Sequence, residues 1–177
     1  MKFLFENWKF LLNHEGRKMD KKKYKKVAVG GTFDRFHYGH RKLLGKAFEI
    51  GETIIVGVSS DVFAGAKGDV DPCDERISNL NSFLANKQYD NFYISRLDDI
   101  YGTTIHENDF DAIVVSKETE PTAIEINEIR QSKDMKPIEV ITIDFVFAAD
   151  GVPISSTRIR NGEIDIKGRL LNENHDK

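Results

Sequence analysis

The residues best suited to chemistry lie in two clusters, and the first is GGTFDRFHYGH at residues 30–40. It follows a short apolar run, Val27–Val29, and precedes a helical pattern of apolar residues. Strand, glycine turn and helix together place backbone N–H groups at a helix N-terminus, where a bound anion is favoured. His37 and His40 are three residues apart at the start of this helix, so they can share one face. The pattern favours a phosphate site, although histidines at this spacing also suit a metal pair or a plain surface.

The second cluster is Ser155-Ser156-Thr157, which is followed closely by Arg158 and Arg160. Three hydroxyl residues at a helix start can cap unpaired N–H groups, which is the purely structural interpretation. One cap needs only one hydroxyl, however, and two arginines nearby suit the binding of a polyphosphate. The cluster is therefore a second candidate phosphate site.

Both clusters resemble motifs of a known enzyme superfamily. The first reads G-T-F-D-x-x-H-x-G-H and resembles the first motif of the nucleotidyltransferases related to class I aminoacyl-tRNA synthetases. The second resembles their I-S-S-T-x-I-R element, which grips the β- and γ-phosphates of the nucleotide. These enzymes join a nucleoside monophosphate from a triphosphate to a phosphate or carboxylate, and they release pyrophosphate.

A third stretch narrows the resemblance to one family. Residues 114–130 read VVSKETEPTAIEINEIR and resemble the V-S-x-E-T…A…I-N…R element of phosphopantetheine adenylyltransferase in its archaeal and eukaryotic branch. Lys117 stands where Glu or another polar residue is expected in that family. The resemblance extends from about Val27 to Ile164 and leaves the first 26 residues outside it.

The resemblance implies transfer of AMP from ATP to 4′-phosphopantetheine, which gives dephospho-coenzyme A and pyrophosphate in coenzyme A biosynthesis. The attacking phosphate is already anionic, so no general base is needed. The protein must position two anions and stabilise the charge that develops between them. Mg²⁺ would be carried by the ATP phosphates rather than by protein ligands, because it retains much of its hydration shell. Asp34 is an alternative metal ligand, although a role in stabilising the turn is favoured.

The resemblance also assigns roles to individual residues. Catalysis is expected of His40, as the donor that stabilises the transition state, and of His37 and Lys67. The residues expected to contact ATP are Gly31, Thr32, Phe33, His37, His40, Ser155, Ser156, Thr157 and Arg158. The residues expected to contact the acceptor substrate are Thr32, Lys67, Glu125, Asn127 and Arg130. The last three of these also fit an ordinary solvated helix face.

Two other classes of function stay open. A related enzyme could transfer CMP to a phosphoalcohol such as glycerol 3-phosphate, or AMP to flavin mononucleotide. The cytidylyltransferases usually carry R-T-x-G-I-S-T-T at the second motif, whereas Gly151-Val152-Pro153 precedes ISST here, which favours the adenylyl interpretation. A non-catalytic nucleotide-binding sensor would be expected to lose a histidine or the serine cluster, and both are present.

The composition is that of an ordinary domain. The 177 residues suit one domain with a sizeable core, and the formal net charge of −3 argues against a general nucleic-acid binder. The single cysteine, Cys73, excludes an internal disulfide and fits a reducing cytoplasm. No apolar run approaches the roughly 20 residues that span a bilayer, so no membrane partner is expected. The chain is expected to be a monomer or a small homo-oligomer.

Apolar strands that alternate with helices predict an α/β fold, a doubly wound Rossmann-like sheet of five parallel strands. The expected strands are Val27–Val29, Thr53–Ser59, Asn91–Leu97, Ala112–Ser116 and Ile138–Phe145. In such sheets a ligand binds beyond the carboxyl ends of the strands, where the strand order reverses. The glycine turn and the serine cluster follow strand ends, so the predicted fold brings them to one edge.

The expected domain boundaries are as follows. Residues 1–26 form a helical or disordered extension with no catalytic role, or sequence upstream of a start at Met19, and end in a solvated lysine run. Residues 27–165 form the nucleotidyltransferase domain, in which residues 60–71 are a loop with one helical turn at most. Residues 166–177 form a flexible polar tail.

Overall fold

The structure is a computed structural model that describes residues 22–65 and 69–171. Within these residues, five parallel strands form one sheet in the order β3-β2-β1-β4-β5. The strands are β1 Tyr24–Gly31, β2 Gly51–Ser59, β3 Phe92–Leu97, β4 Ala112–Ser116 and β5 Glu139–Ile143. The five-stranded parallel α/β sheet expected from the sequence is confirmed, and the strand ends differ from the expected ones by three residues or fewer.

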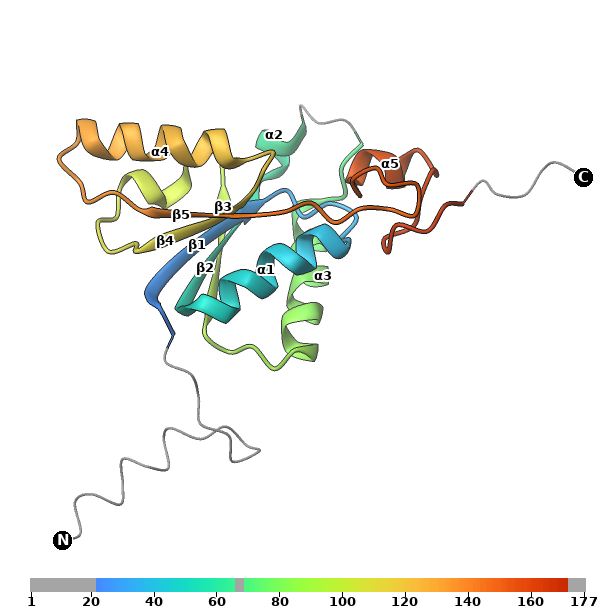
Figure 1. The fold of residues 1–177 in the computed structure, drawn as a ribbon, viewed down its shortest axis with the longest axis horizontal. Helices are drawn as coiled ribbons and strands as arrows, with labels where there is room; N and C mark the ends of the chain where they lie inside the picture. Colours follow the sequence, from blue (N-terminus) through green and yellow to red (C-terminus); the bar gives the residue numbers. More distant parts are fainter. Residues whose placement is uncertain (1–21, 66–68, 172–177) are drawn as a thin grey trace, which may run out of the picture.

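Helices cover both faces of the sheet (Figure 1). The helical elements within the described residues are α1 Tyr38–Ile50, α2 Asp61–Ala64, α3 Cys73–Asn86, the 3₁₀ helix η3 Gly102–Ile105, α4 Glu120–Ser132 and α5 Ser156–Arg160. Helices α1 and α3 lie on one side of the sheet and α4 on the other, while α5 lies beyond the end of the sheet. No described helix is long and apolar enough to span a lipid bilayer.

The alternation of side chains along β1 separates two cores. Val27 and Val29 point to the face where Leu44 of α1 and Leu80 of α3 are fully buried. Ala28 points to the opposite face and packs with residues of α4 and of the segments around it, among them Phe110, Ile113, Ala123, Ile126 and Ile138. A strand buried on both faces reads as a continuous apolar run, which is why the short sequence VAV marked the centre of the sheet.

The order of the strands reverses at β1. Its neighbours are β2, reached through α1 on one face, and β4, from which the chain continues to β5 through α4 on the other face. Connections that leave in opposite directions open a crevice between the carboxyl ends of the two central strands. The glycine turn after β1 and the residues after β4 both lie at this crevice.

The N-terminal boundary of the domain lies earlier than expected. β1 begins at Tyr24, which pairs with Gly51, so residues 24–26 belong to the sheet. One lysine of the expected solvated run is held by the domain: Lys26 forms ion pairs with Glu107 and Asp109, and its side chain is 18% exposed. Lys23 and Lys25 are exposed, as expected. Residues 1–21, with the helical pattern expected of them, lie outside the described residues.

The C-terminal boundary lies later than expected. Residues 166–171 were expected to belong to a flexible tail, and this expectation is wrong for them. The Ile166 carbonyl accepts a hydrogen bond from the backbone of Tyr38 at 3.0 Å, and the Gly168 carbonyl accepts one from Ala149 at 2.9 Å. A small apolar cluster that includes the fully buried Ile164 holds this segment in place. The segment therefore packs beside the start of α1, close to the histidine motif.

Candidate active site

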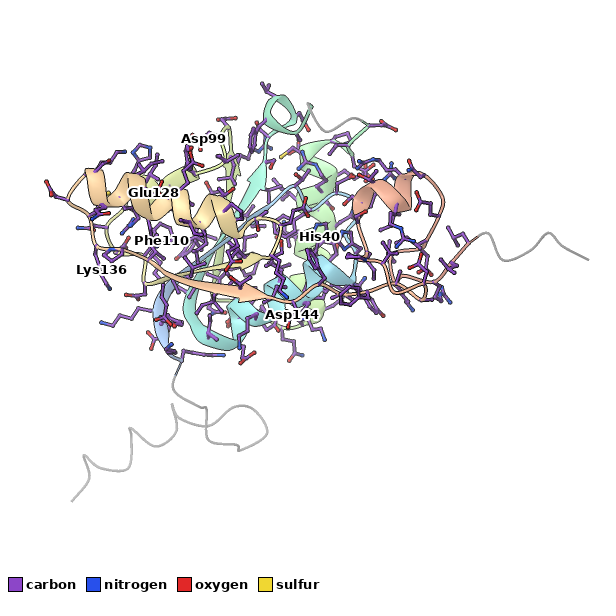
Figure 2. All side chains as sticks on the ribbon, turned by 45° about the horizontal axis from the view of Figure 1, so that its top comes forward. His40, Asp99, Phe110, Glu128, Lys136 and Asp144 are labelled. Atoms are coloured by element: carbon purple, nitrogen blue, oxygen red, sulfur yellow. The ribbon has the colours of Figure 1, made fainter. Side chains whose placement is uncertain are left out.

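A cleft of about 490 Å³ opens at the carboxyl end of the sheet, a size that suits a small-molecule ligand. Its walls come from the turn after β1, the start of α1, the ends of β4 and β5, and α5. Figure 2 shows His40 and Asp144, which both line it, toward the end of the molecule where α5 lies. Glu128 and Lys136 lie toward the opposite end of the molecule.

The cleft brings together most of the site residues predicted from the sequence. Those that line it are Gly31, Thr32, His37, His40, Ser155, Ser156 and Thr157. They come from two segments more than 110 residues apart, so their meeting is a property of the fold. That they contact ATP stays a prediction.

The two histidines form a reciprocal cap on α1. His37 is the N-cap residue, and its Nδ1 accepts the backbone N–H of Gly39 at 3.1 Å, while Nδ1 of His40 accepts the backbone N–H of His37 at 3.4 Å. A neutral imidazole that accepts at Nδ1 carries its proton on Nε2. Each ring therefore presents an Nε2–H donor on the side away from the helix backbone, as a phosphate ligand requires.

Burial keeps His37 neutral. Its side chain is buried, and this burial lowers the pKa of the imidazole from 6.5 to about 4, an effect that the carboxylate of Asp34 partly offsets. Its ring stacks on that of His40 with the centroids 3.8 Å apart. At neutral pH, His37 is therefore a fixed, uncharged donor.

This pKa shift predicts how stability depends on pH. Because the pKa of His37 is lower in the folded state, the unfolded chain binds the proton first as the pH falls. The contribution of the neutral His37 side chain to the free energy of unfolding is complete above pH 6.5. It is lost between pH 6.5 and about 4, by up to about 3 kcal/mol.

The variant His37→Asn tests this prediction. It keeps an N-cap acceptor but removes the titrating group, so its urea midpoint should fall less steeply than that of wild type between pH 6.5 and about 4. His106→Asn, at an exposed histidine outside the cleft, is the control and should keep the wild-type slope. Equal slopes in wild type and His37→Asn would contradict the assignment.

The side chain of Phe33 packs under the histidine motif, and the expected contact of this residue with ATP stays a prediction. Its side chain is fully buried and does not line the cleft, and its backbone φ is 55°. A bulky residue at positive φ is strained, so the surrounding packing must hold it there. The ring centroid of Phe33 lies 5.3 Å from that of His40, and Phe36 stacks on His40 at 5.9 Å. The strained turn thus fixes the orientation of the His40 ring.

The hydroxyls of the second cluster have separate tasks. Ser155 is the N-cap of α5, and its side chain accepts the backbone N–H of Arg158 at 3.3 Å. Ser156 Oγ donates to the backbone oxygen of Asp34 at 2.7 Å, and Thr157 Oγ1 accepts from Arg160 at 3.2 Å. The capping interpretation therefore accounts for one hydroxyl, while the other two join the second motif to the first and to an arginine.

Arg160, rather than Arg158, faces the cleft. Arg158 does not line it and instead forms ion pairs with Asp150 and with Glu163. Arg160 lines the cleft and forms an ion pair with Asp34. The expected contact of Arg158 with ATP stays a prediction, and the geometry favours Arg160 as the arginine that a ligand in the cleft would meet. The sequence carried the signal, since the arginine that ends I-S-S-T-x-I-R corresponds to Arg160.

The expected acceptor residues on α4 lie away from the cleft. Arg130 is fully buried and donates to the backbone oxygens of Lys136, Thr104 and Glu107. Asn127 exchanges two hydrogen bonds with the backbone of Ile138, each at 2.8 Å. Glu125 accepts a hydrogen bond from the hydroxyl of Tyr101. These contacts hold α4 to its neighbours, and the binding of the acceptor substrate by these residues stays a prediction. The residues from this motif that do line the cleft come just before α4: Ser116, Glu118 and Thr119.

One buried arginine was missed by sequence reasoning. Arg76 of α3 is fully buried and donates to the backbone oxygens of Thr32, Ser59 and Asp71. Arg76 therefore holds the turn after β1 in place from the interior of the domain. Its neighbours in the sequence have the pattern of an ordinary helix start, so nothing there distinguished Arg76 from a solvent-exposed arginine. The expected phosphate-binding residue Lys67 lies outside the described residues.

Comparison with known proteins identifies the family. A sequence model of the cytidylyltransferase-like family matches residues 28–162. The phosphopantetheine adenylyltransferase of Methanothermobacter thermautotrophicus is 57% identical over 152 residues, which cover 85% of this chain and 92% of the relative. That of Methanopyrus kandleri is 46% identical over 81% of this chain and 92% of the relative. A solved structure of a protein with unknown function from Archaeoglobus fulgidus is 36% identical, with a TM-score of 0.64 over 67% of this chain and 89% of that one.

The fold and the paired motifs thus define a nucleotidyltransferase of the cytidylyltransferase-like family, to which the chain belongs. Within this family it belongs with the archaeal phosphopantetheine adenylyltransferases.

Proposed function

We propose that this chain transfers AMP from ATP to 4′-phosphopantetheine, with release of pyrophosphate and formation of dephospho-coenzyme A. One observation carries the proposal: the cleft unites the histidine motif with the serine cluster and Arg160 in a chain 57% identical to a phosphopantetheine adenylyltransferase. The alternative transfers of CMP to a phosphoalcohol and of AMP to flavin mononucleotide are not favoured, because the curated relatives carry the adenylyltransferase name.

The chain's own residues supply positioning and charge stabilisation. The Nε2–H groups of His37 and His40 would donate to the α-phosphate, where negative charge builds as the acceptor phosphate attacks. Ser156, Thr157 and Arg160 would hold the β- and γ-phosphates, which leave as pyrophosphate. Because the nucleophile is an anion already, the reaction asks the protein for no proton transfer, and a neutral His37 meets this requirement.

We place the acceptor at the turn after β1 and at the residues after β4. Thr32 lies at the edge of the glycine turn, and Ser116 and Thr119 line the wall of the cleft on the β4 side. Ser116 and Thr119 also hydrogen-bond each other, from the Ser116 backbone N–H to Thr119 Oγ1 at 3.2 Å, so this wall is ordered. The acceptor phosphate would reach the α-phosphate from this side.

Mg²⁺ would enter as part of the ATP complex. The described residues contain no cluster of three histidine, cysteine or carboxylate side chains that could hold a metal ion. Asp34, the alternative ligand, is engaged with Arg160 and with the backbone of Asp71. The donors that line the cleft suit anions, so phosphate oxygens and water would coordinate the ion. We also propose a cytoplasmic location, which the free buried thiol of Cys73 supports.

A pyrophosphate-release assay tests the function. The full chain with Mg²⁺ is supplied with ATP, CTP or GTP, each in combination with phosphopantetheine, glycerol 3-phosphate or flavin mononucleotide. We expect rapid release of pyrophosphate only in the combination of ATP with phosphopantetheine. Release with CTP and glycerol 3-phosphate would replace the proposal with the cytidylyl alternative, and ATP binding without release would favour a sensor.

A further inference from the structure

A buried carboxylate lies where the phosphates are expected. Asp34 lines the cleft, yet only 2% of it is exposed. Its Oδ1 accepts the backbone N–H of Asp71 at 3.1 Å, and its Oδ2 forms an ion pair with Arg160. Its backbone oxygen accepts the hydroxyl of Ser156. Asp34 therefore joins the turn after β1, the segment before α3, and α5.

A carboxylate at this position has an electrostatic cost. It repels the phosphates that the cleft is proposed to bind, and its burial removes hydration that must be replaced by other partners. Charge alone therefore predicts that a neutral side chain at position 34 would tighten ATP binding. The arrangement makes sense if the carboxylate does something for binding that outweighs this repulsion.

The anchor of the carboxylate is rigid. Asp71, whose N–H it accepts, is itself held by Arg76, which donates Nε–H to the Asp71 backbone oxygen at 2.6 Å. The Asp71 side chain forms an ion pair with Arg35 at 3.2 Å. Since Arg76 is fully buried, this chain of contacts ties the Asp34 carboxylate to the core of the domain. The other oxygen of that carboxylate consequently presents a fixed acceptor to Arg160.

The partner of this acceptor faces the cleft. The Arg160 side chain is 16% exposed and also donates to Thr157 Oγ1 at 3.2 Å. A long, flexible side chain held between a carboxylate and a hydroxyl loses its rotamer freedom before any ligand arrives, which lowers the entropy cost of binding. Arg158 on the same helix makes a similar ion pair with Asp150, but this pair lies outside the cleft. It offers a comparison in which an arginine–carboxylate pair of α5 has a structural role alone.

We propose that Asp34 is a positioning residue for nucleotide binding and acts through Arg160, whose guanidinium it holds in place at the phosphate end of the cleft. The inference rests on the proposed function, since it takes the ligand there to be a nucleoside triphosphate. It predicts that loss of the Asp34 carboxylate weakens ATP binding, whereas charge repulsion alone predicts that this loss tightens it.

A double-mutant cycle measured by calorimetry tests the inference. ATP with Mg²⁺, without acceptor, is titrated into the full-length wild type, Asp34→Asn, Arg160→Met and the double variant. We expect Asp34→Asn to raise the Kd for ATP about tenfold, because the guanidinium is no longer held. In the Arg160→Met background, where only the charge repulsion remains, the same change should leave ATP binding no weaker and should tighten it slightly. Should Asp34→Asn fail to fold, Asp34→Ser, which keeps a hydroxyl acceptor but removes the charge, replaces it in both backgrounds of the cycle.

Three results would overturn the inference: an unchanged Kd in Asp34→Asn, tighter ATP binding in that variant, or an equal loss in both backgrounds. Asp150→Asn is the matched control, since it removes one of the two carboxylate partners of Arg158, the other arginine of α5. It should lower the melting temperature without changing the Kd for ATP. Turnover of ATP and phosphopantetheine by the wild type separates the proposed function from the proposed role of Asp34. Absence of turnover would contradict the function. Where turnover is present, the double-mutant cycle tests the role of Asp34 independently.

Discussion

Replacing His40 by alanine is expected to lower kcat about 100-fold or more while the Kd for ATP rises far less. Its ring is held between Phe33, Phe36 and His37, so its Nε2–H group has a defined direction before substrate binds. A preorganised donor aimed at charge that develops in the transition state lowers the activation free energy by about 2.7–4 kcal/mol. Steady-state kinetics of pyrophosphate release, with ATP binding measured separately by calorimetry, give the two quantities.

Two further variants sharpen this test. His40→Gln keeps an N–H donor on a side chain of similar reach, and we expect its kcat to lie between those of wild type and His40→Ala. His106→Ala removes an exposed histidine outside the cleft and should turn over normally. Near wild-type kcat in His40→Ala would remove this residue from the catalytic role.

Replacing Arg130 by methionine is expected to lower the free energy of unfolding by about 3 kcal/mol or more. The change leaves the carbonyls of Thr104, Glu107 and Lys136 without their donor, and each buried unsatisfied group costs about 1–3 kcal/mol. The KM values for ATP and phosphopantetheine should stay close to those of wild type in the folded protein, because Arg130 does not line the cleft. Urea denaturation and steady-state kinetics measure the two effects.

Lys133→Met is the matched control for this prediction. Lys133 lies one turn further along, at the end of α4, and donates to the backbone oxygen of Ile105 from an exposed position. Loss of this contact should change stability by a small fraction of the Arg130 effect. A large rise in the KM for phosphopantetheine in Arg130→Met, with stability unchanged, would restore Arg130 to the acceptor site and contradict its structural role.

The sequence predicted those features that depend on local pattern. Apolar runs such as AIVVS at Ala112–Ser116 have the length and composition of buried strands, and their alternation with helices implies a parallel sheet. The rule that ligands bind at carboxyl ends then brought the glycine turn and the serine cluster to one cleft. Residues 60–71 were expected to form a loop with one helical turn at most, and the short helix α2 lies within them.

Side-chain direction and long-range hydrogen bonds were beyond the reach of the sequence. Arg158 and Arg160 are two residues apart on a short helix, and although the motif I-S-S-T-x-I-R ends at Arg160, the packing of α5 is what turns this residue toward the cleft. Arg130 resembles a solvated arginine until the fold places three backbone carbonyls around it. The left-handed backbone of Phe33 is a further case, since phenylalanine rarely adopts it and no local signal announces it.

The central claim, adenylyl transfer to phosphopantetheine, is tested most directly by identifying the product in a competition. The full chain is given equal amounts of ATP and CTP together with equal amounts of phosphopantetheine, glycerol 3-phosphate and flavin mononucleotide. The products are then separated by chromatography, identified by mass spectrometry and quantified. The account predicts dephospho-coenzyme A as the dominant product, formed in equal amount to pyrophosphate. A cytidylylated product, flavin adenine dinucleotide, or no nucleotidyl product at all would contradict it.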